Sequence, residues 1–285
     1  MSARRSATRR RTATRCMVLV AAVGAAYSLL PMWWAVVSSL RSPSAIFQNL
    51  YPLSSRTLWV SHPTLTNYHT LGADGFIGVA IRNSLISTSG TVLLGLLIAI
   101  PAAFAFVVFD SRFMRALFVF VLISFLVPFE AIAIPLGSTF RSLGLENSYL
   151  GLILPAVGNG MAIFLLRQFF FGVPIELLEA ARSDGASWLR VLRSVYVPLC
   201  RPAIVGAATI LFVFQWQSFL WPLIIAPAPN FTVAPVALGE FVGEFQVNYG
   251  AMLAGAAVTG LLPALVFVGA QSMFNRSLAR SGLVG

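Results

Sequence analysis

Few residues of this chain carry a reactive side chain, and the sequence restricts the chemistry open to them. There is no lysine, so the chain can form neither a Schiff base nor the lysine-containing phosphate loop of many ATPases. His62 and His69 lie in one loop and do not fit the helical H-E-x-x-H zinc motif. Cys16 and Cys200 suggest neither a disulfide nor a metal site. We therefore expect no catalytic residue, no metal and no cofactor, with a membrane enzyme as the alternative.

A polar interruption lies between Pro174 and Pro198, late in an otherwise apolar sequence. Pro174 suits the first turn of a helix, and Gly185 can adopt the left-handed conformation that ends it. Ser187 can cap a second helix, which we expect Pro198 to stop. The stretch therefore predicts a helical hairpin between apolar segments. It is interpreted as a docking element for a soluble partner, or as an interfacial amphipathic hairpin without one.

The composition identifies a membrane protein with several spans. Hydrophobic residues make up 58% of the chain and charged residues 10%. Although the net charge is +10, the arginines flank apolar segments, which argues against nucleic-acid binding. Six runs of roughly 20 residues are long enough to cross a bilayer. They cover approximately Met17 to Leu40, Asn83 to Phe109, Ala116 to Leu136, Tyr149 to Phe171, Ala203 to Ala226 and Ala251 to Phe274. The predicted fold is all-α, with six transmembrane helices and the hairpin between spans 4 and 5.

Arginine placement orients these spans. One side carries Arg41, Arg56, Arg82 and Arg141, and the other carries the remaining arginines, including those of the hairpin. The excess predicts that both termini and the hairpin are cytoplasmic, in the inner (cytoplasmic) membrane of a cell. Residues 1–16 are expected to form a basic cytoplasmic tail and residues 17–285 a single transmembrane domain, with outside loops at 41–81 and 227–250. The first run lacks a signal-peptide cleavage site and is expected to remain as an anchor.

The spacing within the hairpin resembles a known family. Glu179-Ala180-Ala181, then Gly185 after three residues, then Val195-Tyr-Val-Pro198 after nine more, is similar to E-A-A-x-x-x-G-x9-I-x-L-P of permease subunits from bacterial ABC importers. Valines stand where isoleucine and leucine are usual. Further stretches resemble the maltose-type carbohydrate permeases: Asn83-Ser-Leu, Leu166-Arg-Gln-Phe-Phe, Asp184-Gly-Ala-Ser and Phe219-Leu-Trp-Pro-Leu223.

This resemblance implies that the hairpin sits in a cleft of an ATP-hydrolysing subunit and transmits its closure to the membrane helices. It assigns this coupling to Glu179, Ala180, Ala181, Asp184, Gly185 and Pro198. It also implies a second permease subunit, most often a different chain, two ATPase subunits, and an extracytoplasmic solute-binding protein or lipoprotein. ATP hydrolysis would belong to the separate subunits, and membrane lipid would surround the spans.

Polar residues within the apolar runs are candidates for the substrate pathway. Glu130 lies in the third run, where a charge is costly unless it faces water, a partner or the protein interior. Asn159 lies in the fourth run, and Gln215, Trp216 and Gln217 lie in the fifth. Amides beside aromatic rings suit a hydroxyl-rich solute. Each residue is equally compatible with hydrogen bonding between helices.

The outside loop 227–250 is longer than a tight connection requires. In position it matches the segment that reaches into the binding protein in maltose-type systems, and its candidate contacts are Asn230, Phe231, Pro235 and Glu240. A passive loop resting on the helix ends is the alternative.

The family resemblance implies import of a carbohydrate such as a sugar, disaccharide or amino sugar. Glycerol phosphate esters are the alternative cargo. An ion-coupled secondary transporter and a structural membrane scaffold are the rival classes; a secondary transporter would need ion-coupling groups, and Glu130 is the one acid well inside a predicted span.

Overall fold

The computed structural model describes residues 2–48, 50, 54–73, 75–242 and 247–281, with side chains from residue 14 to residue 271 outside those gaps. Within these ranges the chain is helical, apart from turns and an isolated antiparallel bridge between Val242 and Val247. This confirms the predicted all-α class. The contacts divide the chain into two compact units: Met1–Asp74 with Phe241–Val258, and Gly75–Glu240 with Thr259–Gly285.

The first unit contains the long helix α1 (Ser2–Ser39), the short 3-10 helices η1 (Pro43–Ala45) and η2 (Ser55–Leu58), α2 (Thr66–Gly72) and the start of α14 (Tyr249–Ser281). The predicted basic tail is therefore continuous with the first apolar helix.

Buried Arg41 organises the loop after α1. Its Nη2 donates to the carbonyl oxygens of Arg56 at 2.6 Å, Thr57 at 2.8 Å and Trp59 at 3.1 Å. Burial lowers the pKa of this guanidinium from its usual range. Asn67 donates through Nδ2 to the carbonyl oxygens of Ser39 and Arg41. These bonds tie the loop to the end of α1 and to α2 with side-chain donors.

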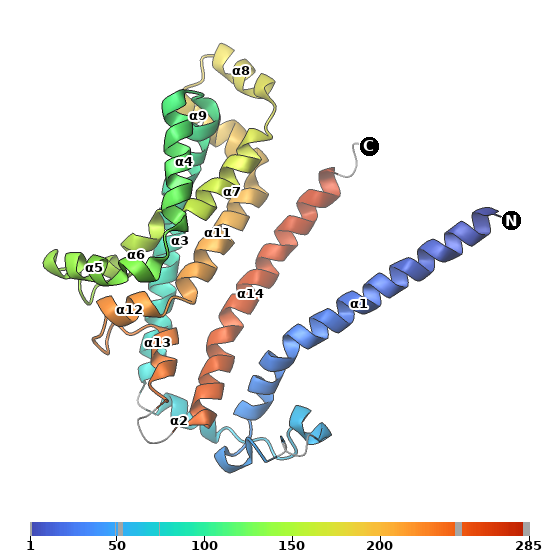
Figure 1. The fold of residues 1–285 in the computed structure, drawn as a ribbon, viewed down its shortest axis with the longest axis vertical. Coiled ribbons are helices and arrows are strands. Elements are labelled where there is room, and N and C mark those ends of the chain that lie inside the picture. Colours follow the sequence, from blue (N-terminus) through green and yellow to red (C-terminus); the bar gives the residue numbers. More distant parts are fainter. Residues whose placement is uncertain (1, 49, 51–53, 74, 243–246, 282–285) are drawn as a thin grey trace. The chain divides into compact units, whose positions relative to one another are not determined.

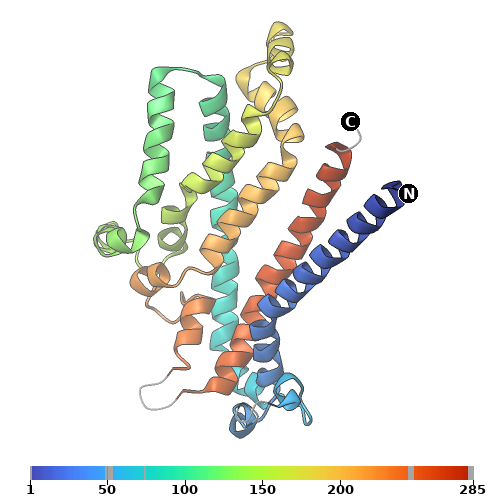
Figure 2. The same ribbon diagram turned by 45° about the vertical axis from the view of Figure 1, so that its right-hand side comes forward.

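The second unit is built around α3 (Phe76–Val108), which packs against α6 (Tyr149–Val157), α7 (Gly160–Phe171) and α11 (Arg201–Trp216). Helix α4 (Arg112–Leu126) lies against α7, and α5 (Phe129–Ser142) against α12 (Leu220–Ile225). Two short helices, α8 (Ile175–Ser183) and α9 (Trp188–Val191), lie at one end of this unit, and α12 and α13 (Ala234–Gly239) lie toward the other (Figures 1 and 2).

In the part of the chain that the structure describes, three helices are long and apolar enough to cross a membrane: Thr14–Ser39, Phe76–Val108 and Tyr249–Gln271. The number reaches six if each of three bent helix pairs is one span, which agrees with the predicted count. The predicted third span is not straight, because α4 and α5 meet at 94°. Pro128 precedes α5 in an extended conformation and cannot donate the backbone hydrogen bond that would continue α4. The fourth run is likewise bent, by 44° between α6 and α7.

Candidate functional site

The predicted hairpin is present, and its turn has the geometry expected of a helix ended by glycine. Gly185 has φ of +79°, in the left-handed region. Its N–H donates to the carbonyl oxygen of Arg182, and the N–H of Ala186 donates to that of Ala181, both at 3.0 Å. This pair of bonds is the Schellman motif, which satisfies the last carbonyls of a helix. Since a residue with a Cβ is strained at this φ, the prediction for Gly185 is confirmed.

The second arm starts as predicted but extends further. The hydroxyl of Ser187 accepts from the N–H of Arg190 and caps α9. After α9 the chain makes a wider π-helical turn, Leu192–Tyr196, and one more turn, α10 (Val197–Leu199). The expectation that Pro198 stops this arm is wrong, because Pro198 lies in the first turn of α10, where its missing N–H is tolerated. The sharp bend, 86°, comes at Cys200 before α11.

An arginine and a tryptophan brace the two arms of the hairpin. The Nη1 of Arg182 donates to the carbonyl oxygen of Ala186 at 2.6 Å. Its guanidinium carbon lies 4.2 Å from the ring centre of Trp188, which in turn contacts Phe109 edge to face at 5.2 Å. These contacts fix the turn against the segment between α3 and α4.

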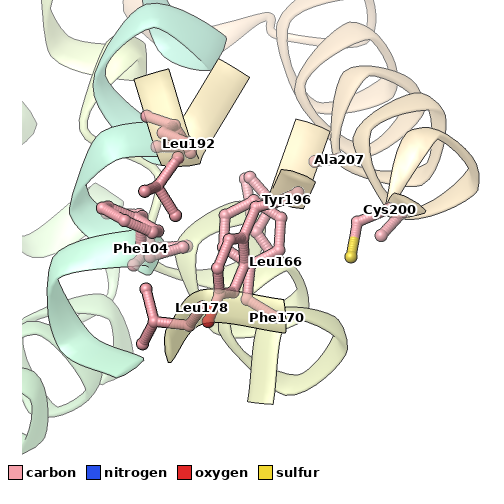
Figure 3. Packing of buried hydrophobic residues seen from close by; sticks show 14 of the residues in the cluster. Phe104, Leu166, Phe170, Leu178, Leu192, Tyr196, Cys200 and Ala207 are labelled. Atoms are coloured by element: carbon pink, nitrogen blue, oxygen red, sulfur yellow. The ribbon is translucent and has the colours of Figure 1, made fainter. Parts of the chain in front are cut away.

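One face of the hairpin is buried in the apolar core of the second unit. Leu178 and Tyr196 are in the same cluster as Phe104 of α3, Leu166 and Phe170 of α7 (Figure 3). Tyr196 is 1% exposed and contacts the rings of Phe104 at 4.9 Å and Phe170 at 5.4 Å, both edge to face. The hairpin is therefore packed against the long helices rather than loosely tethered to them.

The opposite face carries the acidic and glycine residues of the expected coupling set. Glu179, Ala180, Asp184 and Gly185 are exposed, whereas Ala181 is partly buried. Among the described residues, neither Glu179 nor Asp184 takes part in an ion pair. Nothing lies within 4 Å of where a Cβ on Gly185 would be. This face offers two carboxylates beside a glycine, over which a partner can approach the backbone closely.

The candidate pathway residues have different settings in the structure. Glu130 is exposed in the first turn of α5, beyond the break at Pro128, where the helix dipole favours a carboxylate. Asn159 caps α7 by accepting from the N–H of Ala162 at 3.0 Å. Glu130 thus lies outside the α4 helix that carries most of the predicted third span, and Asn159 stabilises a helix end.

The three residues near the end of α11 differ from one another. Gln215 is buried and donates through Nε2 to the carbonyl oxygen of Leu152 at 3.3 Å. Trp216 is buried and donates through Nε1 to the carbonyl oxygen of Thr259 at 3.2 Å. Both connect elements of the second unit, as the helix-bonding alternative expects. Gln217 is exposed.

Hydrogen bonds from Asn83 fix the first part of the loop 227–250, although the sequence did not indicate Asn83 as a site residue. Asn83 of α3 is fully buried and donates through Nδ2 to the carbonyl oxygens of Asn230 and Thr232, both at 2.9 Å. Its Oδ1 accepts from the hydroxyl of Tyr149 at 2.8 Å. We call this set of bonds the Asn83 clamp. The asparagine at the start of the apolar run Asn83 to Phe109 was the signal in the sequence that could have identified it.

Two neighbouring contacts extend the clamp. The N–H of Ala234 donates to Oγ of Ser84 at 2.8 Å, and Oδ1 of Asn147 accepts from the N–H of Ala228 at 2.9 Å. Asn147 has φ of +50°, a conformation that asparagine tolerates better than most residues.

The four candidate contact residues of this loop have different settings. Asn230 is exposed, Phe231 contacts Tyr149 edge to face at 5.4 Å, Pro235 opens α13, and Glu240 is exposed just after it. Residues 243–246 of the predicted loop lie outside the described residues.

Comparison with known proteins identifies the family. Residues 92–280 match the family described as binding-protein-dependent transport system inner membrane component. The sn-glycerol-3-phosphate transport system permease protein UgpE of Salmonella typhi is 30% identical, covering 91% of this chain and 93% of its own. The arabinooligosaccharides permease protein AraQ of Halalkalibacterium halodurans is 28% identical, with 90% and 92% covered. The lactose permease protein LacG of Rhizobium radiobacter is 26% identical, with 96% and 97% covered.

Solved structures agree in fold. A chain of a bacterial ABC transporter that imports the acidic polysaccharide alginate has a TM-score of 0.77 at 21% identity, with 93% of this chain and 97% of that chain covered. A chain of the MetNI methionine ABC transporter has a TM-score of 0.60 at 18% identity, with 72% and 97% covered. The family match covers well over half of the chain. This protein therefore belongs to the family of inner membrane components of binding-protein-dependent transport systems.

Proposed function

We propose that this chain is the permease subunit of an ATP-driven importer and that the hairpin receives the force of ATP hydrolysis from a separate ATPase subunit. The observation that carries the proposal is the division of the hairpin into two faces. Leu178 and Tyr196 anchor one face in the core, whereas Glu179, Asp184 and Gly185 remain exposed without an ion pair among the described residues. A buried face transmits motion, and an exposed acidic face is available to bind basic groups of a partner.

The packing supplies a route for that motion. A displacement of the hairpin must move Tyr196, which contacts Phe104 of α3 and Phe170 of α7. Close-packed aromatic rings cannot absorb such a shift without moving their helices. Rigid movement of α3, α7 and α11 would then alternate access to the pathway between the two sides of the membrane. The arginine distribution supports cytoplasmic termini and a cytoplasmic hairpin.

The assembly we propose has a second permease subunit, two ATPase subunits, and an extracytoplasmic solute-binding protein that contacts the loop 227–250. The exposed Asn230 and Glu240 are the contact residues in the described part of this loop that are best placed for that role. Phe231 and Pro235 would position the loop rather than bind.

We propose a carbohydrate as the cargo, because two of the named relatives are permeases for arabinooligosaccharides and lactose. The exposed amide of Gln217 is available to form hydrogen bonds with the hydroxyl groups of such a solute. Glycerol 3-phosphate is the second candidate, favoured by the UgpE relatives. Measuring the ligands of the cognate binding protein decides between them. Binding protein loaded with the transported solute should stimulate ATP hydrolysis by the transporter, and binding protein offered the other candidate solute should not.

The coupling proposal is tested by Gly185→Asp in the reconstituted transporter. Asparagine and aspartate tolerate positive φ, and a Cβ here meets no atom of this chain, so the variant should insert normally. We expect loss of substrate-stimulated ATP hydrolysis, because the new side chain would separate the hairpin from the partner surface. Gly144→Asp is the matched control, since Gly144 also has a positive φ, +70°, and open space around its Cβ position, but lies outside the hairpin. Unchanged stimulation in Gly185→Asp would contradict the assignment.

A further inference from the structure

We propose that the surface where α4 packs against α7 binds an anionic phospholipid, with Arg167 and Arg115 contacting the headgroup phosphate. Arg167 lies on α7, four residues or about 6 Å before the helix ends. Its guanidinium carbon lies 4.3 Å from the ring centre of Phe118 on α4. Its Nε is buried and has no hydrogen-bond partner among the described residues.

A cation in this setting requires an anion. The described residues give Arg167 no ion pair, and its surroundings are aromatic: Phe118 lies 5.3 Å from Phe106 and 6.4 Å from Phe164, ring centre to ring centre. Stacking on a ring stabilises the guanidinium but does not neutralise it. Ionised groups inside membrane helices are costly unless they are paired or reach the interface. A phosphate at the edge of this contact would supply the missing charge and would accept from the terminal nitrogens of the half-buried guanidinium, whereas Nε is enclosed by the protein.

The beginning of α4 adds positive charge at the same end of this surface. Arg112 and Arg115 occupy its first turn, where the helix dipole already favours an anion and disfavours a cation. Arg115 is three residues before Phe118, so both are on one face of α4. Its carboxylate neighbour, Asp110, is 3.6 Å away, and both side chains are highly exposed, which leaves Arg115 largely available.

The rest of α4 suits a lipid tail. No described residue of this helix is buried, and Phe113 and Phe120 are 72% and 66% exposed. Basic side chains between membrane helices near one membrane face are known to bind anionic headgroups. The combination favours a phospholipid over a carboxylate from another subunit, because a phospholipid satisfies the arginines and covers the adjoining apolar surface.

The test uses the full-length chain in its purified transporter, reconstituted with equal amounts of phosphatidylglycerol and phosphatidylcholine. Native mass spectrometry then gives the ratio of the two lipids retained. We expect phosphatidylglycerol to be enriched, and Arg167→Gln to reduce that enrichment about fivefold. Arg167→Lys should retain part of it, because lysine keeps the charge but not the planar fork. Arg190→Gln, which removes an exposed arginine of the hairpin, should leave it unchanged.

Several outcomes would overturn the proposal. These are equal retention of both lipids by the unaltered chain, equal effects of Arg167→Gln and Arg190→Gln, and displacement by inorganic phosphate, which would indicate a site for a free anion. Loss of the second permease subunit with unchanged lipid ratios would show that a protein carboxylate is the occupant. If Arg167→Gln fails to accumulate, Arg115→Gln tests the same site at an exposed position and should also lower the enrichment.

Discussion

Removing the amide of Asn83 should release the loop that begins at Pro227. In Asn83→Ala the carbonyl oxygens of Asn230 and Thr232 lose their donor, and the hydroxyl of Tyr149 loses its acceptor. Leaving a buried polar group unsatisfied costs about 1 to 3 kcal/mol, and we take the low end because the bonds to Asn230 and from Tyr149 are only partly buried. At the low end, the three losses add to about 3 kcal/mol, which would raise the opening equilibrium of the loop by roughly 150-fold. Tyr149→Phe breaks one bond and should raise it by about fivefold.

A cysteine reporter measures this opening. Thr232 is 3% exposed, so Thr232→Cys should react slowly with a maleimide in a chain whose Cys16 and Cys200 are replaced by serine and alanine. If opening is faster than labelling, the labelling rate follows the opening equilibrium. The rates should therefore increase in the order unaltered chain, Tyr149→Phe, Asn83→Ala. Equal rates in all three would refute the clamp, and equal rates in the two variants would show that the carbonyl contacts contribute nothing.

Three further predictions concern other parts of the molecule. Gln215→Ala should lower the thermal unfolding temperature of the purified chain, because it removes a buried interhelical bond, whereas Gln217→Ala should leave that temperature unchanged and lower the transport rate in vesicles. Gly151→Ala should reduce accumulation in the membrane, since its Cβ would collide with a backbone carbonyl, and Gly158→Ala, in open space, should not. Arg41→Lys should speed limited proteolysis of the loop after α1, because one ammonium cannot replace a guanidinium that donates to several carbonyls; unchanged cleavage would contradict that role.

Features that depend on neighbouring residues could be predicted from the sequence. The end of α8 depends on the backbone freedom of Gly185, and the start of α9 depends on the hydroxyl of Ser187 three residues before the N–H that it caps. Both could be predicted from residue type and spacing. The apolar runs likewise indicated the membrane class, because twenty consecutive apolar residues have few other stable settings.

Non-local features could not be predicted in the same way. The partners of Asn83 on the loop are 147 and 149 residues away in sequence, so nothing near Asn83 indicates what its amide binds. The apolar run through Pro128 read as one span, although the chain bends there by 94°. Hydrophobicity records that a segment avoids water and does not record its direction. The buried settings of Gln215 and Trp216 also depend on distant carbonyls, which explains why a pathway role and a packing role were indistinguishable from sequence.

The second arm of the hairpin is helical throughout, including the π-helical turn at Leu192–Tyr196, so the number of residues in the signature sets how the arm is rotated about its axis. One residue advances a helix by about 100° around its axis. Deleting or inserting a single residue between Gly185 and Pro198 would therefore turn the buried side of the arm, which carries Tyr196, away from Phe104 while leaving its composition almost unchanged. The number of residues in this segment sets the angular phase between the exposed acidic face and the core, and a chain of identical chemistry with a different count would be out of phase.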